Sequence, residues 1–422
     1  MDDRQRVRAG QVFVAGGQPT VTYNPREELA LESKVLDYLS TRYKILSIAG
    51  PTKAGKTVLL RRVVPDRVSI AGGELHSLDD FWNTVADELE VHTSEHVTTS
   101  TSEGSETQTT VGGGARPLGF GVSADHATAS TAETTRERDT GRTRPARLAA
   151  RDELRRSLPT VVIDDFHYVD PELQGQIIRG LKDLVYEGVG VILASVPHRS
   201  YDAVRVEKEM TGRVQHIDIP FWSTEELLAI PREGFAALNV TDPNGIAARL
   251  AGESFSSPLL MQDFCLQLVR DEGVDQALDE PVALHRRADW NAFFRERAAS
   301  GSKPSFDLLS RGPRQRTDRK ERTLRDGSTT DIYGAILKAI AYTGPLTELK
   351  YVQLRAALRE VLEDEVPQQQ DVTRVLEQMS KIARERIEGE PVVDYDSTLE
   401  TLHISDPYFA FYLRWAVRPD AT

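Results

Sequence analysis

The ten residues from Ile48 to Thr57 read I-A-G-P-T-K-A-G-K-T, and they constrain the fold of this chain more than any other segment. Gly50, Gly55, Lys56 and Thr57 fill the spacing G-x-x-x-x-G-K-[ST]. In this pattern backbone N–H groups surround phosphate groups, the lysine contacts the outer phosphates and the hydroxyl binds magnesium. The spacing therefore predicts a phosphate-binding loop.

The residues on either side of the loop support this prediction. The apolar run Ile45-Leu46-Ser47-Ile48 precedes it, and a segment of helical character from residue 58 follows it. A strand, a glycine-rich loop and a helix N-terminus are the context in which this motif binds an anion, whereas a chance glycine turn has no such context. We expect the nucleotide to contact the whole loop: Gly50, Pro51, Thr52, Lys53, Ala54, Gly55, Lys56, Thr57 and Val58.

A second motif ends in two acids. The run L-P-T-V-V-I-D-D, which ends at Asp165, reads as a buried strand of a parallel sheet, and we expect it beside the strand of the phosphate loop. We assign Asp164, together with Thr57, to Mg²⁺, and Asp165 to the attacking water. The alternative is an acidic strand end exposed to solvent, but the two motifs occur in the order expected of a nucleotide site.

Three further residues are candidates for the chemistry of phosphoryl transfer, in which an arginine often neutralises developing charge. Arg199 lies just past the fourth predicted strand and could contact the γ-phosphate in cis. Arg213, directly before the fifth strand, could reach the site of a neighbouring copy in trans, and a surface salt bridge is the alternative for each arginine. Ser195 ends the fourth strand and either polarises the water or only caps the strand.

The order of the predicted elements indicates the fold class. Apolar strands near residues 45–48, 66–70, 158–164, 190–195 and 214–219 alternate with helical segments. This alternation predicts an α/β fold, the parallel sheet of a P-loop NTPase flanked by helices, with its ligand at the carboxyl ends of the strands.

Composition limits the other possibilities. The formal net charge of −13 over 422 residues argues against a protein that coats nucleic acid through its overall field. No apolar run approaches the length of a membrane span, so we expect no membrane partner. The N-terminus lacks the pattern of a secretory signal and the chain has one cysteine, Cys265, which together favour the cytoplasm. Trp82, Trp222 and Cys265 read as core residues.

We predict four regions along the chain, and a small hairpin or extended arm near its start, at 11–23. A low-complexity insertion interrupts the first region at about 92–147, where Thr, Ser, Glu and Gly dominate, and we expect it to be remote from catalysis. Three amphipathic helices and a probable hairpin make the last region a winged helix. The regions are the P-loop ATPase core at 1–222, a helical lid at 223–300, a linker at 301–330 and the winged-helix domain at 331–422.

The order of these motifs resembles the STAND and initiator-type AAA+ ATPases, including the archaeal-type ATPases that end in a winged helix. The stretch D-D-F-H-Y-V-D from Asp164 is similar to the D-D-x-H-W-x-D signature of STAND regulators. The resemblance implies ATP as the nucleotide, Mg-dependent hydrolysis, and assembly into a homo-oligomer or with a protein partner. It also implies that residues from Asn24 to Arg26 lie near the adenine and that Pro258 contacts the nucleotide from the lid.

Two functions fit this resemblance. In the first, an ATP-driven switch relays nucleotide state through the C-terminal domain to a protein partner, with bacterial signalling or antiphage defence as settings. In the second, the protein is a DNA-binding initiator or transposition-type regulator whose winged helix contacts duplex DNA. The segment at 372–382 that would read DNA is not strongly basic, which favours the first.

Overall fold

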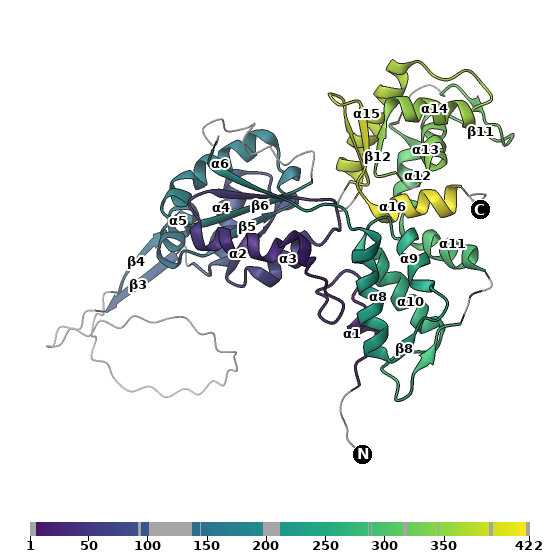
Figure 1. Ribbon diagram of the computed structural model, residues 1–422. Helices are drawn as coiled ribbons and strands as arrows, with labels where there is room; N and C mark the ends of the chain where they lie inside the picture. Colours follow the sequence, from purple (N-terminus) through teal and green to yellow (C-terminus); the bar gives the residue numbers. More distant parts are fainter. Residues whose placement is uncertain are drawn as a thin grey trace, which may run out of the picture.

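The computed structural model describes residues 6–91, 145–196, 212–285, 287, 289–314, 319–344, 346–387 and 391–418, together with the backbone of residues 94–100 and 137–143. Its parts follow one another from the sheet domain through a helical lid to a C-terminal domain (Figure 1).

The centre of the first domain is a five-stranded parallel sheet in the order β2-β5-β6-β1-β7. The predicted α/β fold class is thereby confirmed. One expectation about the sheet is wrong: β5, which carries the acids, does not lie beside β1, because β6 pairs with both strands and separates them. The strands are β1 (Ile45–Ala49), β2 (Arg67–Ala71), β5 (Thr160–Asp164), β6 (Gly190–Ser195) and β7 (Val214–Asp218).

Helices cover both faces of this sheet, and the strands supply apolar side chains to each face in turn. Leu46 and Ile48 belong to one core cluster, while Ile45 belongs to the other, as the two-residue period of a strand requires. The covering helices are α2 (Leu31–Thr41) and α3 (Lys56–Val63) on the first face, and α4 (Leu78–Glu88), α5 (Ala146–Ser157) and α6 (Pro171–Tyr186) on the second. A strand buried on both faces is therefore mostly apolar, without the polar alternation of a half-exposed strand.

The N-terminal segment differs from its prediction. Instead of a hairpin or an extended arm at 11–23, the chain forms the short helix α1 (Ala9–Val12), a series of turns, and the 3₁₀ turn η1 (Glu27–Leu29) before α2. Val12 and Phe13 are fully buried against the lid, where Phe13 makes an edge contact with Phe235 at 5.7 Å between ring centroids. Burial in the lid core, rather than pairing with a second strand, determines the path of this segment.

The lid is a group of helices, three of which begin at residues whose side chains cap them. Ser223 caps α8 with a full capping box, and Ser257 and Asp289 accept backbone N–H bonds at the starts of α10 and α11. Cys265 is fully buried in this lid core, as predicted. The helices are α8 (Thr224–Leu238), α9 (Ile246–Glu253), α10 (Pro258–Asp271) and α11 (Trp290–Gly301).

The C-terminal domain combines helices with an antiparallel sheet in the order β12-β14-β13. Its element order, helix, strand, two helices and hairpin, is typical of winged-helix domains. The elements are α13 (Ile332–Thr343), β12 (Glu348–Lys350), α14 (Tyr351–Val361), α15 (Gln369–Arg386), β13 (Val393–Asp396) and β14 (Thr401–Ile404).

The segment predicted as a linker, 301–330, contains an ordered helix, α12 (Lys303–Arg311). Leu309 of this helix is fully buried in the core of the C-terminal domain. Arg319, part of the basic run in this segment, pairs with Asp331 and lies over the ring of Tyr333 at 4.4 Å. Part of the predicted linker therefore belongs to the folded domain.

A last helix, α16 (Pro407–Tyr412), and the π-helical turn after it, η6 (Leu413–Val417), join the C-terminal domain to the lid (Figure 1, yellow). Phe411 and Trp415 belong to the core cluster shared by the lid and the sheet domain. Phe409 and Leu413 belong to the core of the C-terminal domain. One short segment is thus buried in two cores at once.

Smaller elements complete the described chain. Within the predicted insertion, β3 (Ser94–Ser100) pairs antiparallel with β4 (Glu137–Thr143), and the rest of 92–144 lies outside the described residues. Two short ladders join β8 (Val240–Thr241) to β9 (Val282–Ala283) and β10 (Arg322–Thr323) to β11 (Thr329–Thr330). Over the described part of the chain, no helix is both long enough and apolar enough to cross a membrane.

Candidate nucleotide-binding site

The predicted phosphate loop lies between β1 and α3, at the carboxyl end of the sheet. Gly55 forms the N-cap of α3 with φ of +96°, a conformation that favours glycine. Gly50 lies against β7, where an added Cβ would come within 2.9 Å of Ile219 Cβ. Both glycines of the motif are therefore required by the backbone itself.

Lys56 is almost fully buried, and its side chain lies within the loop. Its Nζ donates to the carbonyl oxygens of Gly50 at 2.9 Å and Pro51 at 3.0 Å. The loop carbonyls therefore hold the ammonium group inside the phosphate loop, as its predicted contact with phosphates requires.

Thr57 and Asp164 come together although 107 residues separate them in sequence. Thr57 Oγ1 donates to Asp164 Oδ2 at 2.5 Å, across the gap between α3 and the end of β5. A hydroxyl and a carboxylate are ligands that Mg²⁺ prefers, with phosphate oxygens and water completing its shell. Among the described residues no group of three or more His, Cys, Asp or Glu side chains is placed to bind a metal.

Asp165 directly follows β5 and has a left-handed backbone, with φ of +54°. It lines a cavity of about 330 Å³ together with Lys56 and Thr57. Burial, reinforced by the charge of Asp164, raises the pKa of Asp165 from its usual 3.8 to about 6, while Lys56 acts in the opposite direction. A carboxyl group with a pKa in this range can exchange a proton near neutral pH.

Sequence reasoning missed a glycine that supports these acids. Gly72 follows β2 and begins the 3₁₀ turn η2 (Gly72–Glu74), which packs against the turn η3 (Phe166–Tyr168). A Cβ at Gly72 would lie 2.5 Å from the carbonyl oxygen of Asp165 and 3.0 Å from that of Asp164. The Gly72-Gly73 pair at the end of a predicted strand was the signal available in the sequence.

A second cavity, of about 70 Å³, adjoins the phosphate loop and is lined by Asn24, Arg26 and Pro258, the residues expected near the adenine. Gly55 and Val58 line both cavities. The two cavities therefore share a wall on the phosphate loop. The 330 Å³ cavity lies beside the phosphate-binding residues, where a polyphosphate is expected. The 70 Å³ cavity lies between the N-terminal segment and the lid, where the base is expected.

Two of the expected adenine contacts are already engaged within the chain. Arg26 Nε donates to Glu226 Oε1 at 2.7 Å, and its terminal nitrogens donate to the carbonyls of Pro220 and Phe221, both at 3.0 Å. Asn24 Nδ2 donates to the carbonyl oxygen of Glu226 at 3.0 Å. These side chains shape the wall of the cavity by tying the N-terminal segment to the lid.

Trp222 is buried, as predicted, but also contacts the loop directly. Its Nε1 donates to the carbonyl oxygen of Ala54 at 2.9 Å, and the Arg26 guanidinium lies 4.9 Å from its ring centroid. The indole therefore links the phosphate loop to the wall of the second cavity, a role that its apolar character alone did not indicate.

The candidates for assisting phosphoryl transfer lie in different places. Ser195 is buried at the end of β6, between β1 and β5, and its carbonyl oxygen accepts the N–H of Gly50 at 3.1 Å. Arg213 is exposed and precedes β7, at the amino end of the sheet and therefore opposite the end that carries the loop, so a role in trans stays a prediction. Arg199 lies outside the described residues.

Three solved structures resemble this chain over most of its length. The Walker-type ATPase of Pyrococcus abyssi is 14% identical, with 98% of this chain and 99% of that chain covered and a TM-score of 0.53. Cdc6p of Pyrobaculum aerophilum is 11% identical, with coverages of 98% and 100% and a TM-score of 0.44. A STAND protein with a tetratricopeptide repeat sensor from Pyrococcus horikoshii is 11% identical, with coverages of 97% and 44% and a TM-score of 0.35.

The match to the Walker-type ATPase and the parallel sheet described above together decide the fold. This chain has a P-loop NTPase fold. No protein-family model matches the sequence, and no curated protein matches it. At these identities the similarity describes the P-loop NTPase architecture, and the activity has to be argued from the site itself.

Proposed function

We propose that this protein is a Mg-dependent ATPase that works as a switch, coupling its nucleotide state to the position of its C-terminal domain and, through that domain, to a protein partner. ATP is favoured over GTP by the resemblance to STAND and initiator-type ATPases, since no base-reading N-K-x-D motif occurs in the sequence. The proposal has three parts: binding, hydrolysis and coupling.

The binding part rests on the loop and the acids. Lys56 and the backbone from Gly50 to Val58 hold the polyphosphate, while Thr57 and Asp164 hold Mg²⁺. The ion, when bound, neutralises charge on the phosphate oxygens. The cavity beside Asn24 and Pro258 receives the base.

The hydrolysis part assigns Asp165 to the attacking water. Its carboxyl group lies in the same cavity as Lys56 and Thr57. With a pKa of about 6 it is largely ionised at neutral pH, yet basic enough to accept a hydrogen bond or a proton from water. Ser195 ends the strand between β5 and β1, and its proposed role is that of a second polar group for the water.

The coupling part rests on one contact. Lys53, inside the phosphate loop, forms an ion pair with Asp406, the N-cap of α16 in the C-terminal domain. Lys53 also lines the 330 Å³ cavity, and its Nζ lies 5.3 Å from the ring centroid of Tyr408. A polyphosphate in this cavity competes with Asp406 for Lys53, so nucleotide binding and the docking of the C-terminal domain are linked.

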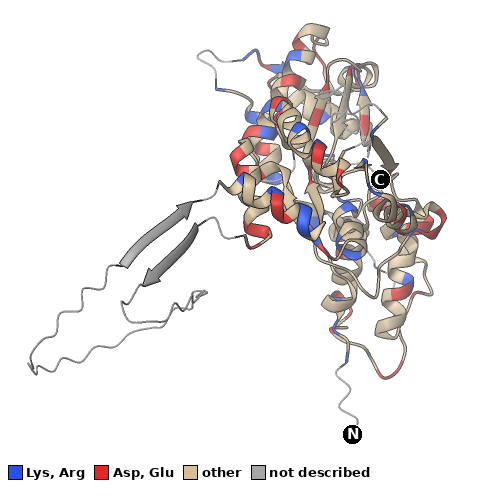
Figure 2. Cartoon of the chain, turned by 90° about the vertical axis from the view of Figure 1, so that its left-hand side faces the viewer, with Lys and Arg blue, Asp and Glu red and all other residues tan. Residues whose placement is uncertain are grey.

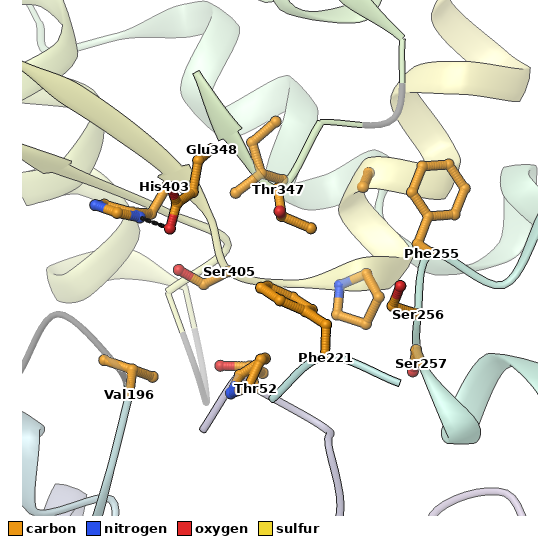
Figure 3. Close-up of a pocket in the computed structure, with 14 residues that line it drawn as sticks. Thr52, Val196, Phe221, Phe255, Ser256, Ser257, Thr347, Glu348, His403 and Ser405 are labelled. Atoms are coloured by element: carbon orange, nitrogen blue, oxygen red, sulfur yellow. Dashed lines mark ion pairs between the residues drawn. The ribbon is translucent and has the colours of Figure 1, made fainter. Parts of the chain in front are cut away.

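A cavity at the same junction extends the contact (Figure 3). Its volume is about 50 Å³, and it lies between the phosphate loop, the start of α10 in the lid, and the C-terminal sheet. Thr52 faces it from the loop and Ser257 from the lid, while His403 and Glu348 form an ion pair on the C-terminal side. All three regions of the chain therefore meet beside the phosphate loop.

Charge supports a protein rather than duplex DNA as the partner. On α15, Lys381 of the predicted recognition segment at 372–382 pairs with Glu385 at 3.7 Å, and Arg384, just past that segment, pairs with Asp394. Acidic and basic residues are interspersed over the chain in the view of Figure 2. Cations that are already paired with neighbouring acids gain little from the phosphate backbone of DNA.

The proposal is tested by measuring nucleotide binding, turnover and hydrogen exchange of α16 on the same protein. We expect ATP to bind and be hydrolysed, Lys56→Ala to lose both, and Asp165→Asn to bind but not hydrolyse. ATP should also speed amide exchange in α16. Full turnover by Lys56→Ala would reject the site, and identical exchange with and without ATP would reject the switch. Binding to duplex DNA that weakens steeply with salt would favour the DNA-binding alternative.

A further inference from the structure

Arg61 lies in the last turn of α3 and is exposed. It lines the 330 Å³ cavity that also contains Lys56, Thr57 and Asp165. Because it follows Thr57 by four residues, both side chains lie on one face of the helix. The cation at this position therefore shares a cavity with the groups assigned to the phosphates and the water.

The neighbouring arginine has a different environment. Arg62 Nε donates to Glu32 Oε1 at 3.1 Å, and its guanidinium lies 4.3 Å from the ring centroid of Tyr23. Within the described part of the chain, no acid pairs with Arg61. Both arginines are favourable near the C-terminus of a helix, but that effect does not explain why only Arg61 faces the cavity.

We propose that Arg61 binds the polyphosphate of the nucleotide in cis. The inference rests on the proposed function and adds a residue to it, distinct from Arg199 and Arg213. A planar guanidinium can donate two parallel N–H bonds to phosphate oxygens, which an ammonium group cannot. Lys53 lines the same cavity but is held by Asp406, so Arg61 is a cation that a polyphosphate reaches without breaking an ion pair recorded in the described residues.

The test is calorimetric titration of the full chain with a non-hydrolysable ATP analogue and Mg²⁺. A charge-assisted hydrogen bond contributes enough for Arg61→Ala to weaken binding about tenfold. Arg61→Lys should recover part of this loss, because it keeps the charge but not the two-pronged geometry. The slope of log Kd against the logarithm of the salt concentration should be smaller for Arg61→Ala than for the unmodified chain, and unchanged for Arg61→Lys.

The matched control is Lys44→Ala. Lys44 is exposed, carries the same charge and directly precedes β1, at the opposite end of that strand from the phosphate loop. Lys44→Ala should leave the affinity for the ATP analogue unchanged. Thermal unfolding of each variant checks that the fold is retained, which is expected for exposed side chains.

The outcomes separate this inference from the function on which it rests. If Lys56→Ala loses binding while Arg61→Ala binds like the unmodified chain, the role of Arg61 is rejected and the nucleotide site stands. If Arg61→Ala and Lys44→Ala lose affinity equally, only net charge matters and the inference also fails. If Lys56→Ala binds as tightly as the unmodified chain, the proposed nucleotide site itself is rejected.

Discussion

Asp165 is the residue whose properties depend most on its surroundings. Its backbone is left-handed, its side chain is half-buried, and the Asp164 carboxylate lies next to it in sequence. Burial and the neighbouring carboxylate disfavour the charged form of Asp165 and raise its pKa to about 6. Proteins retain such arrangements mainly where a function requires them.

This environment predicts the pH dependence of turnover. In the proposed mechanism Asp165 orients water in its ionised form, so kcat/KM for ATP should rise as pH increases from 5 to 7, with a midpoint near 6. Asp165→Asn should remove this rise along with most of the activity. A midpoint near 4 in the unmodified chain would show that a different group is titrating.

The same pKa shift affects stability with a definite sign. The folded pKa of Asp165 lies above its usual value of 3.8, so the folded state binds this proton more tightly. The stabilisation from this group is fully present below about pH 4 and is lost as the pH rises through about 6. The ionised side chain therefore destabilises the fold at neutral pH, a cost that an active-site group commonly carries.

Gly72 offers a test of how the acids are positioned. In Gly72→Ala the new methyl group would overlap the carbonyl oxygen of Asp165, so we expect kcat to fall at least tenfold while ATP affinity changes less than threefold. Stability should fall by about 1 to 3 kcal/mol, as for other overpacked sites.

Gly73→Ala is the matched control for this variant. The nearest heavy atom to a Cβ at Gly73 is Tyr168 Cδ2 at 3.8 Å, an ordinary contact. Gly73→Ala should therefore leave kcat and stability close to those of the unmodified chain. An unchanged kcat in Gly72→Ala, measured beside this control, would contradict the positioning role.

At the scale of elements, α16 connects the nucleotide site to the rest of the chain. Asp406 caps the helix by accepting from Tyr408 N at 2.7 Å and Phe409 N at 3.3 Å, and the same side chain pairs with Lys53. The helix start and the phosphate loop therefore share one carboxylate. A change in the charge around Lys53 therefore changes the electrostatic environment of Asp406 at the N-terminus of α16.

Asp406→Asn isolates this contact, because asparagine caps a helix about as well as aspartate but does not pair with lysine. We expect it to tighten ATP binding several-fold by freeing Lys53, with a stability change below about 1 kcal/mol. The measurement is ATP affinity beside thermal unfolding.

Asp331→Asn provides the control, since Asp331 also caps a helix, α13, and pairs with an arginine, Arg319, but lies outside the nucleotide site. It should leave ATP affinity unchanged. If both variants shift affinity equally, the effect of Asp406 is not specific to the phosphate loop.

The elements themselves were largely predictable from local patterns. Ser77 caps α4 by accepting from Asp80 N, and serine is among the residues that most often begin a helix in this way. The strand at Gly190–Ser195 has the predicted bounds, because a short apolar run between turn residues defines a buried strand. Strand order was not predictable in the same way: it depends on pairing between segments far apart in sequence, which is why β6 was not expected between β1 and β5.

At the scale of the whole molecule, the contacts that join the domains could not be predicted from the sequence. Lys53 and Asp406 are 353 residues apart. Phe411 and Trp415 read as ordinary apolar residues of a C-terminal helix, and nothing local indicates that they pack in the lid rather than in their own domain. The motifs predicted which groups lie near the phosphates, because those spacings are set by local backbone geometry, but not which part of the chain contacts them.

The double burial of the last helix limits what nucleotide alone can achieve. Moving the C-terminal domain away from the lid would expose Phe411 and Trp415 to water, at a cost of about 3 to 6 kcal/mol for two large aromatic side chains. A ligand at a thousand times its Kd supplies at most about 4 kcal/mol toward this separation, and only if it binds the separated state alone. Full separation would therefore expose an apolar surface to solvent. A second macromolecule that buries the Phe411 and Trp415 rings would offset the free energy that ATP binding leaves uncovered.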